Sequence, residues 1–86
     1  SEIKLLMNLK IITLENIWID KKVKSVVVPG TSGRFEMLNN HAPIVSTLST
    51  GKIKVTDLEN TVEHFNITSG SVEMSDNNIL ILADTQ

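Results

Sequence analysis

Side chains that support catalysis or metal binding are few in this sequence and lie far apart along it. The two histidines, His41 and His64, have no carboxylate at the spacing that joins metal ligands. The chain contains no cysteine, which excludes disulfides, thiolate catalysis and cysteine-ligated zinc. We therefore expect no metal site. By strand alternation His64 faces away from Phe65, which predicts a surface histidine.

The sequence also gives little support for a serine nucleophile or for a phosphate-binding loop. Ser25, Ser46 and Ser49 have no neighbouring histidine and aspartate in the sequence, and a triad built from distant segments stays open at this point. The segment Gly30-Thr31-Ser32-Gly33 has the glycines of a phosphate loop but lacks the Lys-Ser/Thr ending and the helix that follows it. The sequence thus predicts no catalytic residue, no cofactor and no enzyme activity of its own.

The elements that position these residues are expected to be strands. The chain has 10 isoleucines, 8 valines and 8 threonines, whereas alanine, the best helix former, occurs only at Ala42 and Ala83. With 86 residues and 41% hydrophobic side chains, it has enough apolar material for one small core. We therefore predict a single domain over residues 1–86, all-β in class, with no helical domain at its C-terminal end.

Apolar alternation and turn residues predict about eight to ten short strands in an antiparallel β-sandwich or flattened barrel. Alternation from Ile3 to Ile12 predicts a first strand, and a break at 20–22 separates a short strand near 16–19 from a stronger one at 23–28. Further strands are expected at 34–38, 42–48, 53–55, 61–69, 72–74 and 79–84. The expected core includes Leu9, Ile11, Val27, Phe35, Leu48, Phe65, Ile67, Val72 and Ile81. Trp18 is expected to pack in the core or at an edge, with partner contact as the alternative.

Charge and hydropathy exclude several classes of partner. With 8 basic and 10 acidic residues, a formal charge of −2 and 3% aromatic residues, the chain lacks the basic clusters and stacking platforms of nucleic-acid-binding proteins. The longest apolar run, 79–83, is far shorter than the roughly 18 residues of a membrane-spanning helix. No basic segment followed by an apolar one opens the chain, so secretion has no support either.

An ordered set of motifs covers most of the chain. The first block is Val26-Val27-Val28, Pro29-Gly30-Thr31-Ser32-Gly33-Arg34-Phe35, Met37-Leu38, Asn39-Asn40, His41-Ala42-Pro43 and Ile44-Val45. The second block runs from Ile67 through Gly70 to Ser75, then Asn77-Asn78, then Ile79-Leu80-Ile81-Leu82-Ala83-Asp84-Thr85. Because these motifs occur in this order and at these separations, the chain resembles the N-terminal β-sandwich domain of the ε subunit of F-type ATP synthases. The corresponding subunit is called δ in mitochondria. It departs at Glu36, where the family commonly has glycine, and at Asn39, where it often has proline.

The resemblance implies a central-stalk (rotor) subunit with no chemistry of its own. Such a subunit links the γ subunit to the membrane c-ring and couples proton flow to ATP synthesis. The implied location is peripheral, within the complex, at the cytoplasmic face of a bacterial inner membrane, or alternatively on the matrix side in a mitochondrion. The family usually continues into a two-helix hairpin that carries its nucleotide-sensing role, and this sequence stops at Gln86, so we expect no nucleotide binding.

The resemblance also assigns contact residues. Thr31, Ser32, Gly33 and Arg34 match the loop that touches the c-ring, and the alternative is a plain hairpin whose glycines satisfy turn geometry. His41, Ala42 and Pro43 match a segment close to γ, and the alternative is a corner held by a histidine hydrogen bond. The competing function is a free-standing small β-barrel that binds a ligand or acts as an enzyme, which requires convergent polar groups in a concave site.

Overall fold

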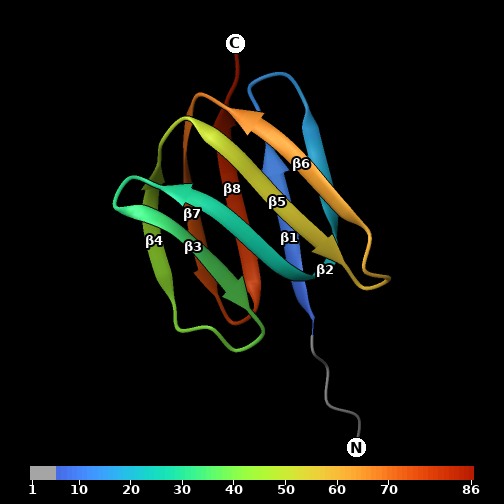
Figure 1. Ribbon diagram of the computed structural model, residues 1–86. Coiled ribbons are helices and arrows are strands. Elements are labelled where there is room, and N and C mark those ends of the chain that lie inside the picture. The colour runs from blue at the N-terminus through green and yellow to red at the C-terminus, as the bar shows by residue number, and fades with distance from the viewer. Residues whose placement is uncertain (1–5) are drawn as a thin grey trace, which may run out of the picture.

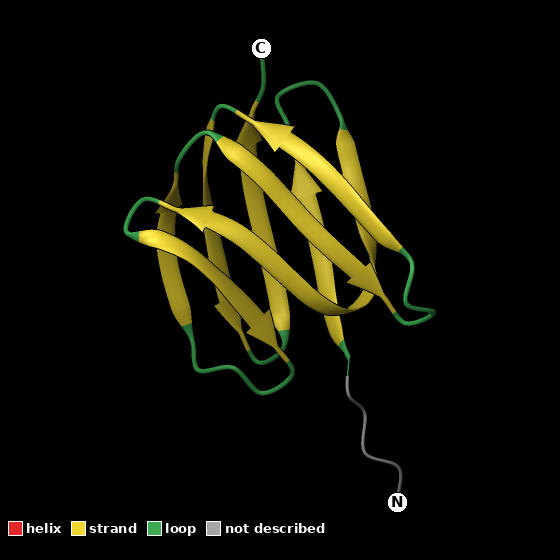
Figure 2. Ribbon diagram, viewed as in Figure 1, coloured by secondary structure: helices red, strands yellow, loops and turns green. Residues whose placement is uncertain are grey.

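The computed structural model describes residues 6–86, which form eight strands and no helix. The strands are β1 (Met7–Ile12), β2 (Ile17–Gly30), β3 (Gly33–Leu38), β4 (Ile44–Leu48), β5 (Gly51–Asp57), β6 (Val62–Ile67), β7 (Ser69–Ser75) and β8 (Asn78–Asp84). Figure 1 shows them in two layers, and Figure 2 shows that loops gather at the two ends. The predicted all-β sandwich is confirmed.

The long strand β2 belongs to both layers. Its first half, Ile17 to Val23, pairs with β1, which continues through β8 and β7 to β4. Its second half, Ser25 to Gly30, pairs with β3 on one side. On the other side, Ser25 to Val27 pair with β5, which in turn pairs with β6. A single pairing of Gly30 with Leu48 connects β2 to β4. The layers are therefore two parts of one strongly bent sheet.

The expected break at residues 20–22 is absent, and β2 runs through it for 14 residues. Polar residues occur there because β2 passes along the edge of the first layer, where Lys21 faces the second layer and Asp20 faces outward beside Lys10. A register shift between Val23 and Ser25 marks a β-bulge, the usual way for a strand to bend from one sheet into another.

The pairing is antiparallel everywhere except between β1 and β8, which run parallel. The two strands come from the two ends of the described chain, and Leu9 lies beside Ile79. A wholly antiparallel sandwich was the expectation, so this pair corrects it. Short turns cannot join parallel neighbours, and here the whole intervening chain makes the crossover.

The core lies between the layers and confirms most of the expected residues. Leu9, Ile11, Leu48, Ile67, Val72 and Ile81 are buried, with Met7, Ile19, Val23, Val26, Val28, Met37, Ile53, Val55, Met74, Ile79 and Ala83. Phe35 and Phe65 are half-buried and pack against this cluster. The expectation was wrong at Val27, whose neighbours Val26 and Val28 point inward instead. The β-bulge explains this difference. Before it the odd-numbered residues of β2 face the core, and after it the even-numbered residues do.

Trp18 packs at an edge, as expected. Its ring stacks on Phe65 with centroids 5.4 Å apart and an interplanar angle of 22°. Because Trp18 comes from the first half of β2 and Phe65 from β6, the pair covers one open side of the sandwich.

Candidate functional site

The loop Thr31 to Arg34 forms the tip of the β2–β3 hairpin, and all four residues are exposed. Thr31 is tied to β4, because its amide donates to the carbonyl of Thr47 at 3.1 Å and the two threonine hydroxyls lie 2.8 Å apart. A side chain at Gly30 would place its Cβ 2.8 Å from the Phe35 ring, so glycine is required where the hairpin closes over that ring. The loop is thus a rigid, exposed tip.

Arg34 does not extend freely into solvent. Its Nη1 donates a hydrogen bond of 2.8 Å to the backbone carbonyl of Lys52, at the start of β5. This contact orients the guanidinium along the outer surface of the second layer and leaves most of its five N–H donors for other partners.

The corner His41 to Pro43 lies between β3 and β4. The His41 amide donates to the carbonyl of Leu38 at 3.0 Å, and His41 Nδ1 lies 2.7 Å from the carbonyl oxygen of Ala42, where it acts as donor. The preceding Asn40 has φ 64° and its amide donates to Oδ1 of Asn77 at 2.7 Å. The histidine hydrogen bond is therefore present, while Ala42 and Pro43 remain exposed.

These two segments lie at opposite ends of the sandwich. Arg34 stands at the beginning of β3, and His41 follows the end of the same strand (Figure 1). Five steps along a strand span about 17 Å. The structure therefore separates the two sets of predicted contact residues instead of bringing them together.

No catalytic constellation assembles within residues 6–86. Each of the three serines bonds elsewhere, Ser25 Oγ to Glu36 Oε2 at 2.5 Å, Ser46 Oγ to its neighbour's carbonyl and Ser49 Oγ to the carbonyl of Pro29. No group of three His, Asp or Glu side chains in the described chain is placed to hold a metal ion. His64 is exposed, as expected.

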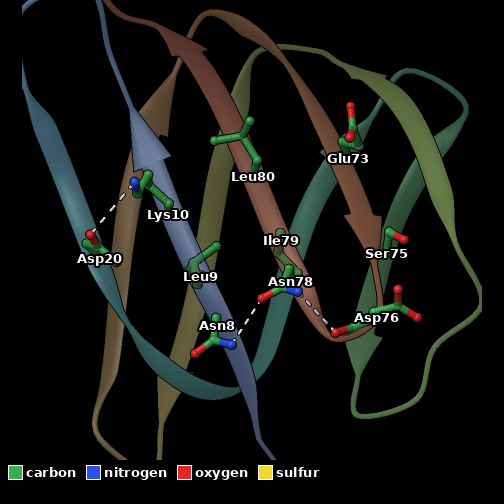
Figure 3. A pocket seen from close by; sticks show the side chains of 10 residues that line it. All are labelled: Asn8, Leu9, Lys10, Asp20, Glu73, Ser75, Asp76, Asn78, Ile79 and Leu80. Carbon is green, nitrogen blue, oxygen red and sulfur yellow. Dashed lines mark hydrogen bonds and ion pairs between the residues drawn. The ribbon is translucent and has the colours of Figure 1, made fainter.

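Figure 3 shows a shallow hollow of polar and apolar side chains on the outer surface of β1, β7 and β8. Two pairs of its polar side chains interact with each other, since Asn8 Nδ2 donates to Asn78 Oδ1 at 3.0 Å and Lys10 Nζ lies 3.9 Å from Asp20 Oδ2. Glu73 and Asp76 lie on the far side of the hollow from Lys10 (Figure 3). The arrangement lacks a convergent set of groups for chemistry.

An apolar patch on the same outer surface was not predicted. It consists of Ile12, Leu14, Leu80 and Leu82, and a further exposed apolar side chain, Val45 of β4, lies on the far side of Glu73. Val45 is 78% exposed and Leu14 99% exposed. The sequence contains a signal for it, because β8 alternates buried Ile79, Ile81 and Ala83 with leucines where a solvent-facing strand normally has polar residues. Apolar patches of this kind are typical of protein interfaces.

A charged cluster joins the two layers. Lys21 Nζ donates to Glu63 Oε1 at 2.6 Å and lies 3.7 Å from Asp57 Oδ2. The hydrogen bond to Glu63 raises the pKa of Lys21 above its ordinary value. The pKa of Asp57 is lowered, chiefly by the hydrogen bond from the Thr61 amide and then by the Glu59 amide and by Lys21. The Thr61 amide lies 3.0 Å from Asp57 Oδ1, and the Glu59 amide lies 2.8 Å from the same oxygen. The cluster is structural, because each member is engaged within the fold.

The family model for the β-sandwich domain of the ATP synthase delta/epsilon chain matches residues 6–86. The ATP synthase epsilon chain of Leptospira borgpetersenii is 37% identical over 78 residues, which are 91% of this chain and 61% of that protein. The epsilon chain of Chlorobaculum tepidum is 30% identical over 76 residues, covering 88% of this chain and 86% of that protein. This chain therefore spans less than two thirds of the first relative and most of the second.

Solved structures agree on the fold. A chain of the Euglena gracilis mitochondrial ATP synthase (OSCP/F1/c-ring) superposes with a TM-score of 0.88 at 16% identity, covering 96% of this chain and 53% of that one. A chain of the Tetrahymena thermophila mitochondrial ATP synthase (central stalk/c-ring) gives 0.76 at 17% identity, with 91% and 63% covered. Residues 6–86 include no helix with the length and hydrophobicity to cross a bilayer.

Proposed function

This chain belongs to the family of ATP synthase delta/epsilon chain β-sandwich domains, and from that membership we propose that it is a non-catalytic rotor subunit of the central stalk. In this role it joins the γ subunit to the membrane c-ring and couples proton flow to ATP synthesis. The subunit acts as a rigid adaptor, so its function depends on shape and packing rather than on reacting groups. Its place is peripheral, on the cytoplasmic side of a bacterial inner membrane or the matrix side in a mitochondrion.

The observation that carries this proposal is the separation of two surface segments by the length of β3, both of them exposed except at the half-buried His41. An adaptor between two partners needs contact surfaces that do not overlap, and a rigid body between them that does not deform under load. Thr31 to Arg34 and His41 to Pro43 meet the first need. The bent sheet, in which β2 belongs to both layers, meets the second.

The contact with γ is proposed to begin at His41, Ala42 and Pro43 and to continue over the apolar patch. Pro43 leads directly into β4, where Val45 is exposed beside Glu73, and Leu80 follows on the next strand. Burying these side chains against a partner removes apolar surface from water, which is the main driving force of association.

The contact with the c-ring is proposed for Thr31, Ser32, Gly33 and Arg34 at the other end. Because the tip is fixed to β4 through Thr31 and to β5 through Arg34, little chain entropy is lost when a partner binds it.

The test uses an ATP synthase from which this subunit has been removed, reconstituted in vesicles. Adding the chain is expected to restore ATP-driven proton pumping. Leu82→Glu, which changes the apolar patch without touching the core, is expected to weaken binding to the γ-containing soluble head at least tenfold. Thr56→Glu, on the opposite outer surface, is the control and is expected to bind the head normally. If the added chain restores no pumping, or if both variants bind the head as the unaltered chain does, the proposal is wrong.

A further inference from the structure

The outer surface of the second layer carries a concentration of positive charge. Strand register places Val27 between Glu36 on β3 and Lys54 on β5, with His64 next on β6. One row nearer the hairpin tip, Arg34 pairs with Pro29 and reaches the carbonyl of Lys52. We call Arg34, Lys52 and Lys54 the basic face.

The basic face is not neutralised within the described residues. The ion pairs of residues 6–86 involve Lys10 and Lys21, and none involves these three cations. Glu36, the one carboxylate in these rows, accepts a hydrogen bond from Ser25. The chain as a whole carries a formal charge of −2, so this surface has the opposite sign to the rest of the molecule. Like charges gathered in this way cost stability in the isolated subunit and favour an acidic partner.

The arrangement is also ordered for recognition. The bond to the Lys52 carbonyl holds the Arg34 side chain along the sheet, so its remaining N–H donors lie beside the Lys52 position. A guanidinium held in place binds a carboxylate with a smaller loss of side-chain entropy than a free one.

We propose that the c-ring contact extends from the hairpin tip across this basic face through Lys52 and Lys54, and that the protein surface it meets is acidic. This inference rests on the proposed contact of Thr31 to Arg34 with the ring. A membrane surface fits less well, because electrostatic binding to anionic lipid generally uses four to eight clustered cations. The face has three, and its rows contain no exposed aromatic anchor.

The test compares two targets, the subunit-depleted complex that contains the c-ring and the soluble γ-containing head that does not. At low salt, Lys54→Glu is expected to weaken binding to the complete complex about tenfold and to leave binding to the head unchanged. The effect should fall to about twofold at high salt. Glu36→Gln, which removes the carboxylate of the face and retains an oxygen for Ser25, should bind the complex more tightly.

Lys22→Glu is the matched control, with the same change of charge on an exposed lysine of the first layer. This variant should leave unchanged the ratio between the affinity for the complete complex and the affinity for the soluble head. If Lys54→Glu behaves like Lys22→Glu, the inference is wrong while the ring contact stands. If the unaltered chain binds the head as tightly as the complex, the ring contact itself is wrong. If the chain binds vesicles containing 30% anionic lipid and Lys54→Glu abolishes that binding, the partner is lipid and the inference is overturned.

Discussion

Arg34 and Lys52 are joined by a hydrogen bond of 2.8 Å from the guanidinium to the backbone carbonyl, although 18 positions separate them. The bond connects the tip of the β2–β3 hairpin to the first residues of β5. One side chain therefore has two possible roles, to fix the hairpin tip and to present positive charge. The two roles can be separated by substitution, because they respond differently to salt.

Arg34→Glu is expected to reduce ATP-driven proton pumping in reconstituted vesicles, most strongly at low salt, where the charge reversal is least screened. The melting temperature of the isolated variant should change by only a few degrees, because the lost hydrogen bond is exposed. Arg34→Lys keeps the charge and serves as the comparison. Normal pumping by Arg34→Glu at low salt would mean that the hairpin tip does not contact the ring.

Phe35→Ala is expected to destabilise the domain by about 2 kcal/mol. Full burial of the ring predicts roughly 3 to 5 kcal/mol, but Phe35 is half-buried and the expected loss is smaller in proportion. Urea denaturation followed by the fluorescence of Trp18, the sole tryptophan, measures the change. A loss as small as that of Arg34→Glu would show that the ring contributes little to the core.

Gly70→Ala is expected to destabilise the domain by about 2 kcal/mol or more, because an added Cβ would overlap the backbone carbonyl oxygen of Leu82. Backbone on the neighbouring strand cannot rotate away as a side chain can. Ser71→Ala, one residue along the same strand, is the control and should change stability much less. Thermal melting of the two variants checks this, and equal melting temperatures would contradict the overlap.

Asp57 is expected to make stability fall in acid. Its folded-state pKa is lowered, so the stability it contributes is fully present above its unfolded pKa near 4 and is lost as pH falls through the lower folded value. Asp57→Asn retains an oxygen for the Glu59 and Thr61 amides and removes the charge. The free-energy difference between the two proteins should therefore shrink as pH falls from 7 to about 2.5. A difference that stays constant over this range would exclude Asp57 as a source of the pH dependence.

Lys21 should act at the opposite end of the pH scale. Its pKa is raised, so its contribution is present below its ordinary value of 10.5 and is lost as pH rises through the folded value. Lys21→Met should remove this alkaline dependence, measured by urea denaturation between pH 9 and 12. A variant as sensitive to alkali as the unaltered protein would contradict the assignment.

The all-β class and most strands follow from the sequence because β-branched residues and turn residues act locally. Asp76 and Asn77, with φ of 50° and 60°, form the turn that their residue types predict. Val27 was wrongly expected in the core because three consecutive valines show no alternation that tells which of them face inward. The β-bulge that decides this depends on pairing with β5. The bridge from Lys21 to Glu63 spans 42 positions, and no local pattern reveals it.

The proposed contact segments could be located from the sequence only through family motifs. Their exposure and their separation by β3 required the structure, and so did the basic face, whose three cations come from two strands that neighbour β2 on opposite sides. The apolar patch is different, because Leu80 and Leu82 already break the polar alternation of β8 in the sequence.

The parallel pairing of β1 with β8 also constrains how the protein is made. During synthesis β1 leaves the ribosome first, but its partner strand ends at Asp84. Until β8 emerges, β1 has no pairing partner along one of its edges. Leu9 then lacks its neighbour Ile79, and Ile11 lacks its neighbour Ile81. The domain is therefore expected to complete its fold only at the end of translation of this segment, and slowly, as for other folds dominated by distant contacts. Until then, nascent chains expose an unpaired strand and need protection from aggregation.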